Sequence, residues 1–270
     1  MSIQKTKPRV QYALKVLHRD KYLLLMFAPI LVYYIVFCYL PMSGAIIAFK
    51  DFAPGKGIYN GQWVGLKWFR EFFSSPFAFR TIRNTVLISF YSLLYGFPVP
   101  IIFAVCISDV GNSKLRRTIQ TVSYLPHFIS TVVLVGMLSN FFNTNTGIVN
   151  NIIALFGGKR LSFLNDPHWF RTIYVGSGVW QNFGFDSIIY MAAITSIDPS
   201  LYEAAKIDGI SRLKQAVYIT VPMISKTIII LLILNLGRIM SVGFEKVFLL
   251  YSPSVYETAD VISTYVYRKG

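Results

Sequence analysis

The sequence predicts an all-α fold, a bundle of helices that crosses a membrane several times. Of the 270 residues, 54% are hydrophobic and only 14% are charged, whereas soluble domains carry about 25% charged residues. The mean hydropathy is +0.52. The apolar residues also gather into stretches about as long as the roughly 20 residues that a helix needs to cross a bilayer. These observations define a polytopic membrane protein.

Five stretches meet the length requirement. They cover about 22–43, 84–107, 119–141, 171–195 and 224–243. The first follows several basic residues, as a signal peptide would, but its apolar run is longer and no small-residue cleavage site follows. We therefore expect it to remain as a helix. Pro98, Pro100 and Pro126 fall within the second and third stretches, where proline can kink a helix.

The basic residues indicate the orientation only weakly. With the N-terminus inside the cell, half of the 26 lysines and arginines fall on the inner side. The inner loops are shorter, however, so their density of positive charge is higher, and the first helix usually dominates the choice. We expect a cytoplasmic N-terminal segment, 1–21, followed by one membrane domain, 22–270.

Charge, cysteine and histidine placement argue against several other classes. The net charge of +14 comes from basic residues in loops, where lipid headgroups are better partners than nucleic acid. Cys38 and Cys106 lie inside apolar stretches and predict no disulfide. The three histidines share no metal-ligand spacing, and no catalytic constellation is present. We therefore predict no metal site, no catalytic residue and no nucleic-acid partner.

The polar interval 196–223 between the last two stretches predicts two short helices joined at a glycine. Asp198 can cap the first helix, with Pro199 at its first position. Gly209 suits the left-handed residue that ends a helix. Ser211 can then cap a second helix, from Arg212 to about Thr220. An ordinary amphipathic loop at the membrane surface is the alternative.

Several motifs carry a family resemblance. The interval contains Glu203-Ala204-Ala205, then Asp208-Gly209, then Ile219 and Pro222, and this pattern resembles the EAA loop of type I ABC importer permeases. The chain is also similar to the LplB-type branch that serves complex carbohydrates. The motifs behind that similarity are Trp63-Val64-Gly65-Leu66, Trp180-Gln181-Asn182, Ile197-Asp198-Pro199 and Val247-Phe248-Leu249-Leu250-Tyr251.

The resemblance implies a fold and a set of partners. The fold would be the MetI-like helical bundle, with a sixth span expected after Gly270. The partners would be a second homologous permease, two ATP-binding cassette subunits, an extracytoplasmic substrate-binding protein, a carbohydrate substrate and membrane lipid. ATP and Mg would bind to the ATPase, so this chain itself would hold no cofactor. The location would be the bacterial plasma membrane, crossed several times.

The resemblance also implies which residues couple the membrane part to the ATPase. In such permeases the loop forms coupling helices that fit a groove on the ATPase. The residues expected at or beside that contact are Glu203, Ala204, Ala205, Asp208, Gly209 and Ser211.

A polar face on the fourth stretch predicts a substrate path. Gly178, Asn182, Asp186 and Tyr190 recur every four residues and share one helical face. A carboxylate costs at least about 2.5–3.5 kcal/mol at the bilayer centre, so this face should meet protein or water. The expected path residues are Trp180, Gln181, Asn182, Asp186, Tyr190, Asn235 and Arg238. A polar contact between helices is the equal alternative.

Depth separates the two charged residues of that path. Asp186 and Arg238 should differ by roughly 13 Å along the membrane normal, given a rise of 1.5 Å per residue. A direct pair is therefore not expected. Arg238 should pair with Glu245 or extend toward the membrane surface.

These expectations combine into a function. The chain is predicted to be a permease subunit of an ATP-driven importer for oligo- or polysaccharides. No phosphate-binding GxxxxGK[ST] loop is present, so a separate subunit should hydrolyse ATP. The alternative is an ion-gradient-driven transporter of a small polar solute, which should show an internal inverted repeat. A membrane-embedded enzyme lacks any supporting constellation.

Overall fold

The computed structural model describes residues 19–52, 55, 57 and 60–269. The predicted cytoplasmic segment 1–21 therefore lies outside the described residues except for its last three. The chain forms two compact units, one ending at Ser75 and the other starting at Pro76.

The first unit is an apolar helical run followed by a small hairpin. Its elements are α2 (Lys21–Tyr33), η1 (Tyr34–Tyr39), α3 (Leu40–Met42), η2 (Ser43–Phe49), β1 (Lys50–Asp51), β2 (Gln62–Trp63) and α4 (Lys67–Ser74). The two strands pair antiparallel, with Lys50 opposite Trp63. The Phe49 and Trp63 rings stack with centroids 5.6 Å apart, and the Trp68 indole donates to the Lys50 carbonyl at 2.9 Å. These aromatic side chains thus pack locally around the hairpin.

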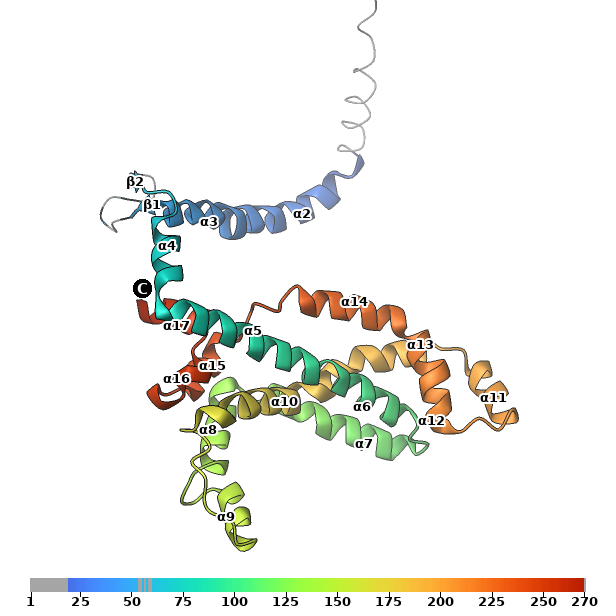
Figure 1. Ribbon diagram of the computed structural model, residues 1–270. Helices are drawn as coiled ribbons and strands as arrows, with labels where there is room; N and C mark the ends of the chain where they lie inside the picture. The colour runs from blue at the N-terminus through green and yellow to red at the C-terminus, as the bar shows by residue number, and fades with distance from the viewer. Residues whose placement is uncertain (1–18, 53–54, 56, 58–59, 270) are drawn as a thin grey trace, which may run out of the picture. The chain divides into compact units, whose positions relative to one another are not determined.

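The second unit is entirely helical where it has regular structure (Figure 1). Its first half comprises α5 (Pro76–Gly96), α6 (Pro98–Ser108), α7 (Ser113–Tyr124), η4 (Leu125–Phe128), α8 (Thr131–Phe141), α9 (Ile148–Leu155) and α10 (Pro167–Thr195). Its second half comprises α11 (Pro199–Ile207), α12 (Arg212–Gln215), η5 (Ala216–Thr220), α13 (Val221–Met223), α14 (Ser225–Leu236), α15 (Phe244–Leu250), η6 (Pro253–Val255), α16 (Tyr256–Ala259) and α17 (Ile262–Lys269).

The first two predicted spans are confirmed and are longer than expected. Lys21–Phe49 and Pro76–Ser108 are both long and apolar enough to cross a membrane. None of the most apolar window of Lys21–Phe49 is buried within the chain, so this helix presents its apolar side chains outward. Such exposure suits contact with lipid or with another membrane subunit.

The third predicted span, 119–141, is bent, in line with the kink that Pro126 predicts, and the fifth, 224–243, begins at a bend and is helical only as far as Leu236. Ser113–Phe128 and Thr131–Phe141 meet at 99°, and Arg212–Met223 and Ser225–Leu236 meet at 64°. Pro126 lies at the first bend, where it cannot donate a helical hydrogen bond. The Ser130 hydroxyl then caps α8 by accepting from the Val133 amide.

The fourth predicted span is the central helix of the second unit. α10 has 29 residues, about 43 Å at 1.5 Å per residue, which is ample for a bilayer. Its mean hydropathy is lower than that of the two helices named above as long and apolar enough to cross a membrane, because polar residues lie along one of its faces. It packs against α5, α6, α7 and α16 (Figure 1).

Two apolar clusters hold α10 near its ends. One joins Ile88 of α5, Leu134 of α8, Phe170 of α10 and Val247 of α15. The other joins α10 to α6 and to the start of α14 beside the loop 196–223, through Ala104, Tyr190, Ile194, Ile197 and Ile224. Ile88, Leu134 and Val247 are at most 1% exposed. The helix is therefore anchored at both ends by side chains removed from solvent and lipid.

Asp260 fastens the last helices to α5. Its side chain is fully buried and accepts from Arg80 at 3.0 Å, from Arg268 at 2.7 Å and from the Thr264 hydroxyl at 2.9 Å. The Asn84 amide donates to the Asp260 backbone carbonyl at 3.0 Å. One carboxylate thus connects α5 with α17 and the turn before it.

α10 and α7 approach closely at Gly184. A Cβ added there would collide with the Ser123 carbonyl oxygen. We expect Gly184→Ala to lower the free energy of unfolding by about 1–3 kcal/mol, because backbone must move to admit the methyl group. Thermal unfolding of the detergent-solubilised protein measures this loss.

Gly176 on the same helix is the matched control. A Cβ there meets no atom within 4 Å. Gly176→Ala should leave the unfolding temperature unchanged or raise it slightly. Equal unfolding temperatures for the two variants would contradict the close approach.

Candidate functional site

The loop of residues 196–223, which we call the coupling loop after its expected role, begins with the capped helix that the sequence predicts. The Asp198 carboxylate accepts from the Ser200 amide at 2.9 Å, and Pro199 occupies the first helical position. The Ser200 backbone amide, together with its hydroxyl, holds the pKa of Asp198 below its usual value. The ionised carboxylate thus stays bound to the first turn of α11.

Gly209 ends α11 in the left-handed conformation, with φ of +70°. The Gly209 amide donates to the Lys206 carbonyl, and the Ile210 amide donates to the Ala205 carbonyl at 2.9 Å. These two bonds form a Schellman motif, which satisfies carbonyls that the helix end would otherwise leave unpaired. The predicted glycine stop is confirmed.

The second helix begins at Arg212 as expected, but Ser211 does not cap it with its side chain. Other side chains hold the turn. The Gln215 amide donates to the Ile210 carbonyl at 2.7 Å, and the Tyr202 and Thr220 hydroxyls bond at 2.9 Å. Since Tyr202 lies on α11 and Thr220 on η5, the two halves of the loop are joined into one unit.

Exposure separates the predicted coupling residues into two groups. Glu203, Ala204, Asp208, Gly209 and Ser211 are exposed. Ala205 is only 4% exposed. We therefore correct its expected place at the partner contact, because its methyl group is buried within the chain.

Two apolar side chains of the loop were not predicted as contact residues. Ile207 is 87% exposed and Leu213 is 76% exposed. Ile207 follows Glu203 by four residues and so shares its helical face. This four-residue spacing from Glu203 is the feature of the sequence from which Ile207 could have been predicted as a contact residue.

The loop also contacts the turn between α6 and α7. The Arg212 guanidinium donates to the Asp109 carbonyl at 3.2 Å. Arg116 donates to the Val110 carbonyl at 2.7 Å and to the Ser108 carbonyl at 3.2 Å. The coupling loop is thus bonded to a second polar turn at the same end of the unit.

A cavity of about 660 Å³ lies along α10 in the second unit. Its walls come from α5, α6, α10, α14, the segment that follows α14, and α15. The predicted path residues that line it are Gln181, Asn182, Asp186, Tyr190, Asn235 and Arg238. The polar face predicted from the sequence therefore lines this cavity.

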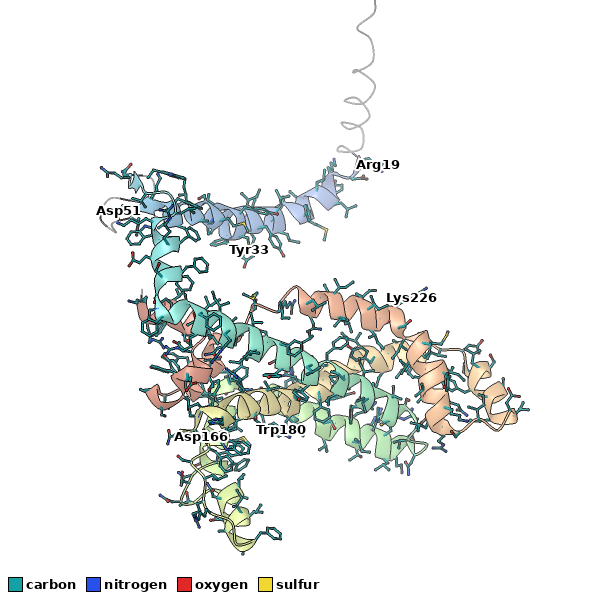
Figure 2. All side chains as sticks on the ribbon, viewed as in Figure 1. Arg19, Tyr33, Asp51, Asp166, Trp180 and Lys226 are labelled. Atoms are coloured by element: carbon teal, nitrogen blue, oxygen red, sulfur yellow. The ribbon has the colours of Figure 1, made fainter. Side chains whose placement is uncertain are left out.

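Trp180 is the exception among the predicted path residues. It does not line this cavity, and it is 44% exposed on another face of α10 (Figure 2). A residue one position before Gln181 is turned by about 100° around the helix axis. The structure therefore does not bring Trp180 into the wall of this cavity with the other predicted path residues.

The same polar face also joins helices. The Asn182 side-chain oxygen lies 2.9 Å from Nδ1 of His127, and the Gln181 amide donates to the Ile129 carbonyl at 2.8 Å. The His127 ring in turn stacks on Phe185, with centroids 3.9 Å apart. Interhelical contact and cavity lining, the two alternatives for this face, thus coexist on it.

Lys246 is a cavity residue that sequence reasoning missed. Its ammonium donates to the Tyr174 carbonyl at 2.9 Å and lies 4.7 Å from the centre of the Tyr174 ring. The expected local pair between Arg238 and Glu245 is absent from the ion pairs among the described residues. Instead, Arg238 lines the same cavity as Lys246.

Comparison with a family model matches residues 96–244 to the binding-protein-dependent transport system inner membrane component. This range contains most of the cavity wall and the whole coupling loop.

Two Bacillus subtilis (strain 168) proteins are similar over nearly the whole chain. Protein LplB is 41% identical over 254 residues, which cover 94% of this chain and 80% of the relative. The polygalacturonan/rhamnogalacturonan transport system permease protein YteP is 40% identical over 268 residues, which cover 99% and 83%.

Two solved structures share the fold. A chain of a bacterial ABC transporter involved in the import of the acidic polysaccharide alginate matches with a TM-score of 0.87 and 45% identity, over 95% of this chain and 86% of that one. A chain of bacterial alginate ABC transporter in complex with alginate pentasaccharide-bound periplasmic protein matches with the same TM-score and identity, over 95% and 85%.

Proposed function

The chain belongs to the family of binding-protein-dependent transport system inner membrane components, and we propose that it carries oligo- or polysaccharides across the membrane as one permease of an ATP-driven importer. It is a membrane transport subunit rather than an enzyme. An ion-gradient-driven transporter, the alternative, is not favoured by this family membership.

The observation that carries the proposal is the connection between the cavity and the coupling loop. α10 lines the cavity through Asn182 and Asp186, and it ends at Thr195, three residues before the capped start of α11. Movement of the loop therefore acts on the cavity through one continuous helix. This arrangement supports alternating access to the cavity, driven by closure of an ATPase dimer.

The remaining parts of the importer lie in other subunits. A separate pair of ATP-binding cassette subunits binds ATP and Mg. One of them contacts the exposed side chains of Glu203, Ile207 and their neighbours. A second homologous permease completes the path, and an extracytoplasmic binding protein delivers the saccharide. The N-terminus then lies in the cytoplasm with the coupling loop. The binding-protein complex among the similar structures supports this composition.

Affinity purification and uptake test the proposal together. The tagged chain, purified from cells that make the whole system, should bring with it an ATPase and a second permease. Deleting its gene should abolish uptake of a labelled oligosaccharide that wild-type cells accumulate. A chain purified without any ATPase, together with unchanged uptake of a full oligosaccharide panel in the deletion strain, would refute the proposal.

Asp186 offers a more local prediction. We expect Asp186→Asn to lower the maximal uptake rate about tenfold or more, since a hydrogen bond to a charged group contributes about 1.5–3 kcal/mol. Labelled-oligosaccharide uptake, normalised to the amount of assembled complex, measures the effect. Trp180→Phe on the same helix should transport normally because Trp180 does not line the cavity. Equal losses in both variants would contradict the assignment of the path.

A further inference from the structure

Two cations of the cavity wall have no carboxylate partner in the described chain. Arg238 and Lys246 both line the cavity, and neither takes part in the ion pairs among the described residues. The hydrogen bond from Lys246 to the Tyr174 carbonyl satisfies one of its three N–H donors. An uncompensated charge in a membrane interior is costly, so such a group attracts an anion.

The one carboxylate among the lining residues is placed too far away to serve Lys246. The ammonium lies level with Gly178, since a Cβ at that glycine would come within 3.3 Å of Nζ. Asp186 follows Gly178 by eight residues, about 12 Å along α10. The absence of a side chain at 178 leaves the space that the ammonium occupies.

Arg238 lines the same cavity from the segment that leads to the helix of Lys246. It lies in the segment 237–243 between α14 and α15, and Gly243 at the end of that segment would place a Cβ 3.4 Å from the Tyr174 hydroxyl. The end of the cavity at Lys246, which lies farther from the coupling loop than Asp186, is therefore cationic. The Asp186 carboxylate lies nearer to the coupling loop, toward the apolar cluster that contains Tyr190 and Ile194.

The rest of the wall suits a hydroxylated ring. Ser89 and Ser92 of α5 join Asn182 and Tyr190 in offering hydroxyl and amide groups, and Phe183 offers an aromatic ring. These groups match the hydroxyls and the apolar face of a sugar. A neutral saccharide, however, would displace water from both cations without giving either a counter-charge.

We propose that this cavity selects acidic saccharides, and that the carboxylate of a uronic acid residue pairs with Lys246 and Arg238 as the sugar enters. The proposal rests on the proposed function and narrows its substrate class. A guanidinium binds a carboxylate through two parallel hydrogen bonds, and the ammonium supplies a second positive charge beside it. Asp186, deeper in the cavity, then repels the carboxylate and favours hydroxyl groups at that level.

The test compares charge variants in cells that contain the complete transporter. The probes are labelled trisaccharides of two kinds: acidic (galacturonate and mannuronate) and neutral (galactose and arabinose). We expect Lys246→Gln and Arg238→Gln each to lower the maximal uptake rate of the acidic probes at least tenfold. Lys246→Arg, which keeps the charge, should retain most of it, and the rate for any neutral probe should stay unchanged.

Glu245→Gln provides the matched control, because it changes a charge on the same helix at a residue outside the cavity. Co-purification of the ATPase and the basal rate of ATP hydrolysis should be the same in all four variants, which separates a role in binding from a role in folding. If the Lys246→Gln variant does not assemble with the ATPase, uptake by the Arg238→Gln variant tests the proposal instead.

Two results overturn the proposal and leave the proposed function standing. One is wild-type uptake of neutral probes without uptake of acidic ones. The other is uptake of acidic probes at the wild-type rate by both glutamine variants. A fully assembled complex that takes up no probe of either kind would overturn the proposed function as well.

Discussion

Replacing Ile207 with aspartate is expected to separate the ATPase from this chain and to stop ATP-driven uptake. Ile207 exposes 87% of its surface on α11, on the same helical face as Glu203. Burying an isoleucine side chain at an interface contributes about 1.5–3 kcal/mol. An aspartate in its place would also leave an unpaired charge in the contact. We therefore expect a loss of about 2–4 kcal/mol in binding, the range of an interface hot spot.

The measurement is the amount of ATPase that co-purifies with the tagged chain, together with ATP-dependent uptake. Leu155→Asp is the matched control, since Leu155 is 84% exposed at the end of α9, outside the coupling loop. It should keep normal ATPase association. Wild-type association and uptake with Ile207→Asp would show that the ATPase does not bind this face of α11.

Removing the Asp260 carboxylate is expected to have the largest effect on stability. Asp260→Ala leaves Arg80 and Arg268 without their shared carboxylate, and both are less than a third exposed. Removing one partner of a buried ion pair costs about 3–5 kcal/mol. The partial exposure of the arginines places the expected loss near the lower end, about 3 kcal/mol. Loss of the contact should detach α17 and the turn before it from α5.

Thermal unfolding of the solubilised protein, followed by size-exclusion chromatography, measures the change. Asp20→Ala is the control because it removes an ion pair of a different kind, the Arg19–Asp20 pair, whose arginine is 74% exposed. Exposed pairs contribute little to stability, so this variant should unfold at the wild-type temperature. An equally small shift for Asp260→Ala would mean that the arginines find other partners.

The features that sequence reasoning predicted well are those set by neighbouring residues. The Asp198 cap and the Gly209 stop depend on the backbone within a few positions, so residue type and spacing suffice to locate them. The polar face of α10 follows from the helical period alone. Its orientation toward a cavity followed from the high cost of a carboxylate in lipid.

The features that it missed depend on residues far apart in the chain. Lys246 donates to a carbonyl 72 positions earlier, and nothing near residue 246 in the sequence indicates that contact. The burial of Ala205 follows from the way α11 meets the second half of the loop. The 99° bend after Phe128 was expected only as a kink, because the proline marks a weak point in the helix but the packing of α8 sets the angle.

The hydrogen bond from Arg212 to the Asp109 carbonyl has a mechanical consequence. A displacement of the coupling loop reaches α10 and α14 through the peptide chain, and it reaches α6 and α7 through this bond. A displacement of the loop is thus shared among α6, α7, α10 and α14. The rigidity of the contact with α6 and α7 depends on the guanidinium of Arg212. Without this hydrogen bond the loop could tilt without moving α6 and α7. Part of each movement of the loop would then be absorbed by local bending of the chain.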